Sequence, residues 1–138
     1  METRKLIISN KATELERIQL FLEQLGTDWS LPAGLIFELN LVLEEYIVNL
    51  ISYAYSDQAY HEIIIEINKE ESQLSILVTD DGNPFNILDA PENDEIEKPV
   101  EERRIGGLGV HFIKKLTDHL DYQSDGGKNR MVMVKKLK

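Results

Sequence analysis

Residues 62–80 read EIIIEINKEESQLSILVTD, and this stretch decides the class of fold. Apolar residues occupy alternate positions on both sides of the polar link 69–72. They are Ile63, Ile65 and Ile67 before the link and Leu74, Ile76 and Val78 after it. Alternation with period two predicts half-buried strands, and a short polar link between them predicts a hairpin. Asp80 continues the buried register, so its carboxylate is predicted to leave the strand toward the core.

Helical periodicity precedes this hairpin. Apolar residues at helical spacing predict a helix over 15–25, with Ser9 or Asn10 as its N-cap and Gly26 as its stop. A broad apolar face predicts a longer second helix over 35–55. The apolar residues of the first helix are predicted to be core, and an interface in a homodimer is the alternative.

The remaining regular segments complete a two-layer fold. A third helix is predicted over 110–119, and strands are predicted over 5–8, 120–124 and 131–137. Hairpins with helices between them predict an α/β fold of the α+β sandwich type, with a mixed, mostly antiparallel sheet and helices on one face. The length of 138 residues suits a single domain over 1–138.

The charge balance limits the partners. The chain carries 15 Lys and Arg against 25 Asp and Glu, a formal net charge of −10. Neutralising phosphates requires clustered Lys and Arg, so direct contact with nucleic acid or a membrane is not expected. The lack of cysteine excludes disulfides and thiol catalysis. No secretory signal or membrane-length apolar run is visible, which predicts a cytoplasmic protein.

Two polar residues stand out on the second predicted helix. Glu45 and Asn49 are four residues apart, so their side chains lie one above the other on the helix surface. A carboxylate there can accept a proton or orient a water molecule. The amide oxygen is a hard ligand that suits Mg²⁺. The alternative is an ordinary solvated stripe.

A second motif, Asp80-Asp81-Gly82, follows the strand that ends the hairpin. A buried carboxylate needs a partner, and the exocyclic amine of a purine is one such partner. Gly82 allows the backbone to turn beneath a flat ligand. The alternative is a plain Asp-Gly turn that ends a strand.

A third motif precedes the third helix, where residues 103–110 read RRIGGLGV. Glycines at a helix start leave backbone N–H groups free, and together with the helix dipole these groups form an anion site. Arg103 and Arg104 would add positive charge to such a site. A flexible linker is the alternative. The long aperiodic stretch that leads into this motif is more typical of a functional lid than of a spacer.

In this order, the three motifs resemble those of the GHKL ATPase superfamily. The strings LEEYIVN at 43–49, DDGNPF at 80–85 and EERRIGGLG at 101–109 look like those of bacterial anti-sigma factor serine/threonine-protein kinases. The resemblance covers nearly the whole chain. It implies a Bergerat-type ATP-binding fold, with ATP and Mg²⁺ as cofactors.

The resemblance also implies a role for each matching residue. Glu45 would be the general base, Asn49 would ligate Mg²⁺, and Asp80 would read the adenine amine above Gly82. The residues implied for the triphosphate are Arg104, Gly107, Leu108, Gly109 and Val110, with residues 85–106 as the ATP lid. Phosphoryl transfer in such a site depends mainly on positioning and charge neutralisation.

The partners follow from the same resemblance. It implies a kinase that transfers the γ-phosphate of ATP to a serine or threonine of an anti-anti-sigma protein of the STAS type, and that sequesters a sigma factor. A nucleotide-gated binding module without kinase activity is the alternative. Two positions depart from the superfamily pattern: Pro84 replaces a glycine, and residues 128–131 lack the usual threonine near the adenine. Asn129 is the candidate to replace that threonine.

Overall fold

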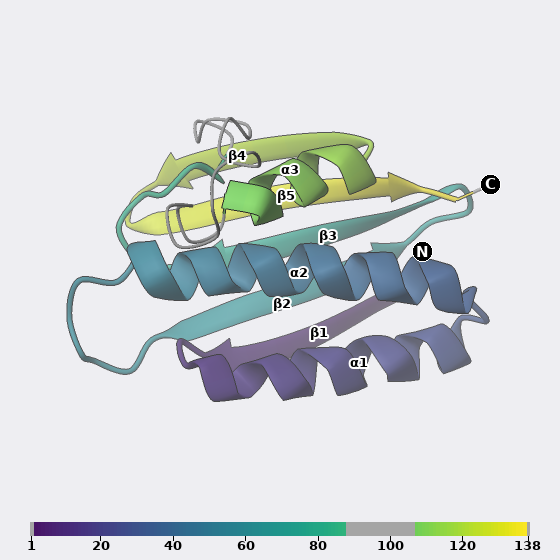
Figure 1. Cartoon of the computed structure of the whole chain (residues 1–138), viewed down its shortest axis with the longest axis horizontal. Coiled ribbons are helices and arrows are strands. Elements are labelled where there is room, and N and C mark those ends of the chain that lie inside the picture. The colour runs from purple at the N-terminus through teal and green to yellow at the C-terminus, as the bar shows by residue number, and fades with distance from the viewer. Residues whose placement is uncertain (1, 88–106, 138) are drawn as a thin grey trace.

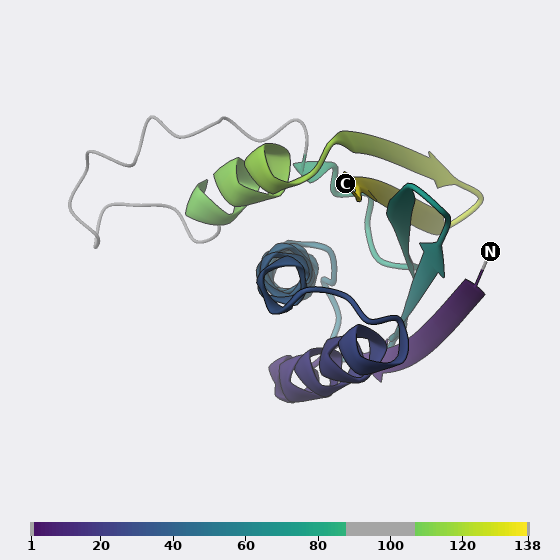
Figure 2. The ribbon, with the colours of Figure 1, turned by 90° about the vertical axis from the view of Figure 1, so that its right-hand side faces the viewer.

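The computed structural model describes residues 2–87 and 107–137, with the backbone alone for residues 107–109. The described elements form two layers, with the helices on one face of one sheet (Figures 1 and 2). The elements in chain order are β1 (Glu2–Ser9), the short 3-10 helix η1 (Ala12–Glu14), α1 (Leu15–Asp28), α2 (Ala33–Tyr53), β2 (Glu62–Lys69), β3 (Gln73–Asp80), α3 (Gly107–Leu116), β4 (His119–Asp125) and β5 (Lys128–Lys136). The predicted fold class is confirmed.

The sheet has the strand order β1-β2-β3-β5-β4, and each neighbouring pair is antiparallel. The predicted hairpin is its centre, with Ile65 paired to Val78 and Ile67 paired to Ile76. All four of these side chains are buried beneath the helices. Burying a large apolar side chain contributes about 1.5–3 kcal/mol, so the alternating pattern sets both the strands and the face that α2 covers.

The helix α1 does not stop at Gly26, so that prediction is wrong. The helix continues to Asp28, and Gly26 lies in its last turns. A Cβ atom on Gly26 would lie 2.9 Å from Cγ1 of Ile36 on α2. The glycine therefore allows the two helices to approach closely.

Neither Ser9 nor Asn10 caps α1, which is a second correction. The 3-10 helix η1 comes first, and Ser9 donates from its backbone N–H and its hydroxyl to Oε1 of Glu14, at 3.2 and 2.9 Å. The side chain of Asn10 instead contacts the segment before β2, where it accepts a hydrogen bond from the N–H of His61 at 3.0 Å. Neither side chain therefore caps the backbone N–H groups at the start of α1, whose N-cap residue is Glu14.

The remaining predicted boundaries shift by a few residues. The helix α2 begins and ends two residues earlier than predicted, and β1 is longer than residues 5–8. The prediction that His119 ends the third helix is wrong, because α3 ends at Leu116 and His119 begins β4. Apart from residues 85–87, the predicted lid over 85–106 lies outside the described residues.

Candidate functional site

The two motifs that sequence analysis placed on α2 and after β3 come together in space. The backbone N–H of Asn83 donates to the carbonyl oxygen of Ala54 at 2.6 Å, which ties the segment after β3 to the end of α2. Tyr46 on α2 lies close enough to Asp80 that the carboxylate charge, after burial, contributes to raising the pKa of the tyrosine. The end of β3 and the C-terminal half of α2 therefore form one site.

Asn49 is oriented by its own helix. The side chain is buried, with 2 % exposure, and its Nδ2 donates to the carbonyl oxygen of Glu45 at 2.7 Å. This bond uses the amide nitrogen, so the amide oxygen, Oδ1, is not needed to hold the side chain in place. A neutral oxygen held in this way fits the Mg²⁺ ligand that the sequence predicts, since Mg²⁺ usually takes one or two protein ligands and keeps several waters.

Glu45 is partly buried one turn before Asn49. Burial, with a smaller contribution from the Glu44 carboxylate, raises the pKa of Glu45 above its ordinary value. No Lys or Arg side chain in the described part of the chain forms an ion pair with Glu45. A carboxylate with a raised pKa and no cation beside it is suited to accept a proton.

Asp80 carries the most informative atom of the site. Its side chain has 2 % exposure, and Oδ2 accepts hydrogen bonds from the Gly82 N–H at 2.9 Å and from Asn129 Nδ2 at 3.1 Å. Oδ1 is buried and has no hydrogen-bond partner among the residues that the structure describes. Burial raises the pKa of Asp80, while the hydrogen bonds from Asn129 and Gly82 act against that rise. A buried acceptor without a donor costs about 1–3 kcal/mol, so this oxygen fits a ligand that supplies an N–H group.

Asn129 holds Asp80 from the neighbouring strand. The register of β3 and β5 places the two residues opposite each other. Besides the bond to Asp80, Nδ2 of Asn129 donates to the Gly82 carbonyl at 2.9 Å, and Oδ1 accepts from the Ser124 hydroxyl at 2.6 Å. Sequence analysis considered Asn129 only as a replacement for a threonine. Its bond to Asp80 has no signal in the sequence, because the register that pairs the two residues is set only in the folded sheet.

Gly82 is required here for space. A Cβ atom would lie 2.7 Å from the Ala54 carbonyl oxygen and 3.0 Å from Cε1 of Tyr55. Among the described residues, the glycines with a left-handed backbone are Gly126 and Gly127. The reason for a glycine at position 82 is therefore the close approach of this loop to the end of α2, and not the backbone turn that the sequence predicts.

Two tyrosine hydroxyls complete the polar lining, and sequence analysis missed both. The hydroxyls of Tyr46 and Tyr55, like Oδ1 of Asp80, are buried without a hydrogen-bond partner within residues 2–87 and 107–137. Burial, and then the charge of Asp80, raise the pKa of both phenols. The region around Asp80 thus holds several polar atoms whose hydrogen bonds the described residues do not satisfy.

The predicted triphosphate residues are described only in part. The backbone of Gly107, Leu108 and Gly109 forms the first turn of α3, so the helix begins three residues before the predicted start at Val110, which is buried. Arg104 lies outside the described residues. The anion site at this helix start therefore stays a prediction.

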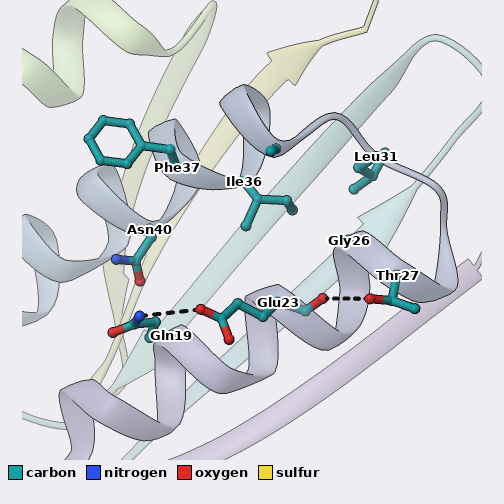
Figure 3. A pocket seen from close by; sticks show the side chains of 9 residues that line it. Gln19, Glu23, Gly26, Thr27, Leu31, Ile36, Phe37 and Asn40 are labelled. Atoms are coloured by element: carbon teal, nitrogen blue, oxygen red, sulfur yellow. Dashed lines mark hydrogen bonds between the residues drawn. The ribbon is translucent and has the colours of Figure 1, made fainter.

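A separate hollow lies between α1 and α2 (Figure 3). It has a volume of about 440 Å³ and is lined by residues such as Gln19, Ile36 and Asn40. It contains none of the predicted site residues. Within residues 2–87 and 107–137, no cluster of three or more His, Asp or Glu side chains could hold a metal ion, and no helix is long and apolar enough to cross a membrane.

The sheet and helices thus enclose the Asp80 carboxylate, one oxygen of which has no hydrogen-bond partner among the described residues. A family model for the histidine kinase-like ATPase domain matches residues 8–135. The chain belongs to this family, which confirms the resemblance found in the sequence.

Curated relatives refine the comparison. Serine-protein kinase RsbW of Listeria innocua is 30 % identical over 103 residues, which cover 72 % of this chain and 65 % of that protein. Serine-protein kinase RsbW of Oceanobacillus iheyensis is 30 % identical over 104 residues, which cover 73 % and 65 %. The chain thus spans about two thirds of the length of these relatives.

Solved structures agree on the fold. The blue-light activated histidine kinase of Erythrobacter litoralis matches with a TM-score of 0.55 and 20 % identity, over 77 % of this chain and 31 % of that one. The histidine kinase domain of the same protein matches with a TM-score of 0.55 and 17 % identity, over 91 % and 60 %.

Proposed function

We propose that this chain is a serine/threonine-protein kinase that binds Mg·ATP between α2, the end of β3 and the start of α3. The phosphate acceptor in this proposal is an anti-anti-sigma protein of the STAS type, and the chain also sequesters a sigma factor. The observation that carries the proposal is the buried Oδ1 of Asp80, to which no described residue donates a hydrogen bond. The 6-amino group of adenine supplies the N–H donor that this oxygen lacks.

The metal and the triphosphate occupy the rest of the proposed site. Asn49 would hold Mg²⁺ through Oδ1, and the metal when bound would neutralise charge on the phosphates. The residues proposed to contact the triphosphate are Arg104, Gly107, Leu108, Gly109 and Val110. The free N–H groups at the start of α3 supply hydrogen bonds and a favourable dipole for an anion.

Glu45 is the general base of the proposal. Its carboxylate accepts the proton of the serine or threonine hydroxyl, whose oxygen bonds to the γ-phosphorus. The bond from that phosphorus to the β–γ bridging oxygen breaks, and ADP leaves. The raised pKa of Glu45 supports this role, because a general base works best with a pKa near the working pH.

Calorimetric titration with ATP, ADP and GTP, each with and without Mg²⁺, tests the site. We expect saturable, Mg²⁺-dependent binding that prefers ATP to GTP. No binding under any condition would refute the nucleotide site altogether. Incubating the chain with γ-labelled ATP and a purified STAS-type protein from the same organism then tests transfer. Binding without transfer would favour the nucleotide-gated module.

A further inference from the structure

His61 lies between two carboxylates just before β2. Its Nε2 is 2.9 Å from Oδ1 of Asp57, and its Nδ1 is 3.0 Å from Oδ1 of Asp81. An ionised carboxylate only accepts hydrogen bonds, and a neutral imidazole has one N–H donor. The two contacts can therefore be hydrogen bonds at the same time only when the ring carries a proton on both nitrogens.

Contacts with Asn10 and Tyr55 also hold His61 in place. Its backbone N–H donates to Asn10 Oδ1 at 3.0 Å, and its carbonyl accepts from the Asn10 N–H at 3.1 Å. Its ring lies 4.7 Å from the ring of Tyr55, centroid to centroid. The backbone and one ring face of His61 are thus held, which leaves the contacts to Asp57 and Asp81 as the part that depends on a proton.

The contact to Asp81 connects His61 to the loop 80–82, which presents Asp80. Asp81 lies between Asp80 and Gly82. Oδ1 of Asp80 has no partner in the described part of the chain, and the Gly82 N–H donates to Asp80 Oδ2. The stacking partner Tyr55 packs against the same loop, since a Cβ atom on Gly82 would lie 3.0 Å from its Cε1. His61 therefore connects the segment after α2 to both sides of the loop that presents Asp80.

We propose that His61 is a proton-dependent positioning residue for nucleotide binding: its imidazolium holds Asp81 and thereby the loop 80–82 in the geometry that presents Asp80 Oδ1. Loss of the proton releases one of the two carboxylates and loosens the loop. The proposal rests on the proposed nucleotide site at Asp80. Only its regulatory part, the dependence on the His61 proton, is new.

The surrounding charges favour the protonated ring. His61 and Asp81 line a hollow of about 240 Å³ on the outer side of the sheet. The other titratable groups around the ring are Asp57, Tyr55, Tyr60, Glu62, Asp80 and Lys128. Carboxylates outnumber the one ammonium group in this set. The hydrogen bond to Asp57 is the largest influence on the pKa of His61 and raises it. Desolvation opposes this rise, and the hydrogen bond to Asp81 adds a smaller rise, so that the pKa lies above its ordinary value.

The direction of the pH dependence follows from that shift. Because the pKa of His61 is raised, both hydrogen bonds of the ring, to Asp57 and to Asp81, are present below the ordinary histidine pKa of about 6.5. One of them is lost as the pH rises through the higher pKa of the folded protein. The side chains are 18 % exposed for His61, 58 % for Asp57 and 41 % for Asp81. Solvent screening therefore limits the effect to a few-fold change in affinity, which decreases at high salt.

Calorimetric titration with Mg·ATP at pH 6.0 and pH 8.5 tests the proposal on the full chain, on His61→Gln and on His119→Gln. Titration of the ATP phosphates affects all three proteins equally. We expect the affinity for Mg·ATP to fall between pH 6.0 and pH 8.5, by a factor about two- to fivefold larger in the parent than in His61→Gln. His119 is exposed on β4, so His119→Gln should behave as the parent. An identical pH dependence in the parent and His61→Gln would overturn the proposal.

An NMR titration without nucleotide separates this proposal from the proposed function. We expect both ring nitrogens of His61 to be protonated at pH 6.0, and the Gly82 amide signal to titrate with the same raised midpoint. In His61→Gln the Gly82 signal should no longer titrate. If His61 titrates and the Gly82 amide does not follow it, the coupling is wrong. If the coupling is present but ATP does not bind, the proposed function fails, and with it the link to nucleotide binding.

Discussion

Asn129 Nδ2 donates to Asp80 Oδ2 at 3.1 Å, across the pair of strands β3 and β5. With the Gly82 N–H on the same oxygen at 2.9 Å, two donors hold one side of the carboxylate. The other oxygen, Oδ1, is buried and has no hydrogen-bond partner among residues 2–87 and 107–137. A carboxylate anchored on one side and unpaired on the other can discriminate among ligands, because a ligand without a donor leaves that oxygen buried and unsatisfied.

Replacing the anchor should weaken binding. Asn129→Ala removes the donor to Asp80 and to the Gly82 carbonyl, so we expect about tenfold weaker ATP binding and a loss of about 1–3 kcal/mol in the free energy of unfolding. Calorimetry and denaturant unfolding measure the two effects. Ser124→Ala is the matched control, because it removes only an exposed hydroxyl that donates to Asn129. Equal effects of the two substitutions would contradict the anchoring role.

Asp80→Asn should change the base preference. The donors on Gly82 and Asn129 require an oxygen beside them, so the new amide must place its NH₂ group where Oδ1 stands now. A donor there opposes the amine of adenine and suits the 6-oxo group of guanine. We expect ATP affinity to fall about tenfold or more while the preference for ATP over GTP is lost or reversed. Parallel titrations with ATP and GTP measure this, and an unchanged preference would refute the role of Asp80.

Glu45→Gln should separate binding from transfer. The variant keeps the size of the side chain but cannot accept the proton, so we expect ATP binding to persist and transfer to fall about 100-fold or more. In the parent, transfer should decrease as the pH falls through the raised pKa of Glu45, since the protonated form is inactive. Glu44→Gln, at the exposed neighbour, is the control and should retain transfer. Parent-like rates in Glu45→Gln would exclude it as the base.

Two glycine substitutions test the packing at the loop. Gly82→Ala places a methyl group 2.7 Å from the backbone oxygen of Ala54, the C-cap residue of α2, which cannot move easily. We expect a loss of about 1–3 kcal/mol in the free energy of unfolding, together with weaker ATP binding. Gly34→Ala, in the first turn of α2, meets no atom within 4 Å and should stabilise the helix by up to about 1 kcal/mol. Thermal unfolding of both variants checks the contrast, and equal effects would refute the steric explanation.

Local periodicity explains which predictions succeeded. The alternation over 62–80 predicts both strands and the buried direction of Asp80, because strand geometry alternates side chains between faces regardless of what they pack against. The stop at Gly26 failed for the opposite reason. Glycine weakens a helix by about 1 kcal/mol, and close packing of α1 on Ile36 outweighs that local preference.

The sequence by itself determined the elements, the two-layer class and the identity of Glu45, Asn49 and Asp80 as candidates, since each depends on spacing within one segment. Only the tertiary structure decided what surrounds Asp80. Its bond to Asn129 joins residues 49 positions apart, and the contact of His61 with Asp81 spans 20. Such contacts depend on strand order and register, here on β5 pairing with β3. Those are set by the packing of the whole domain, which no local pattern encodes.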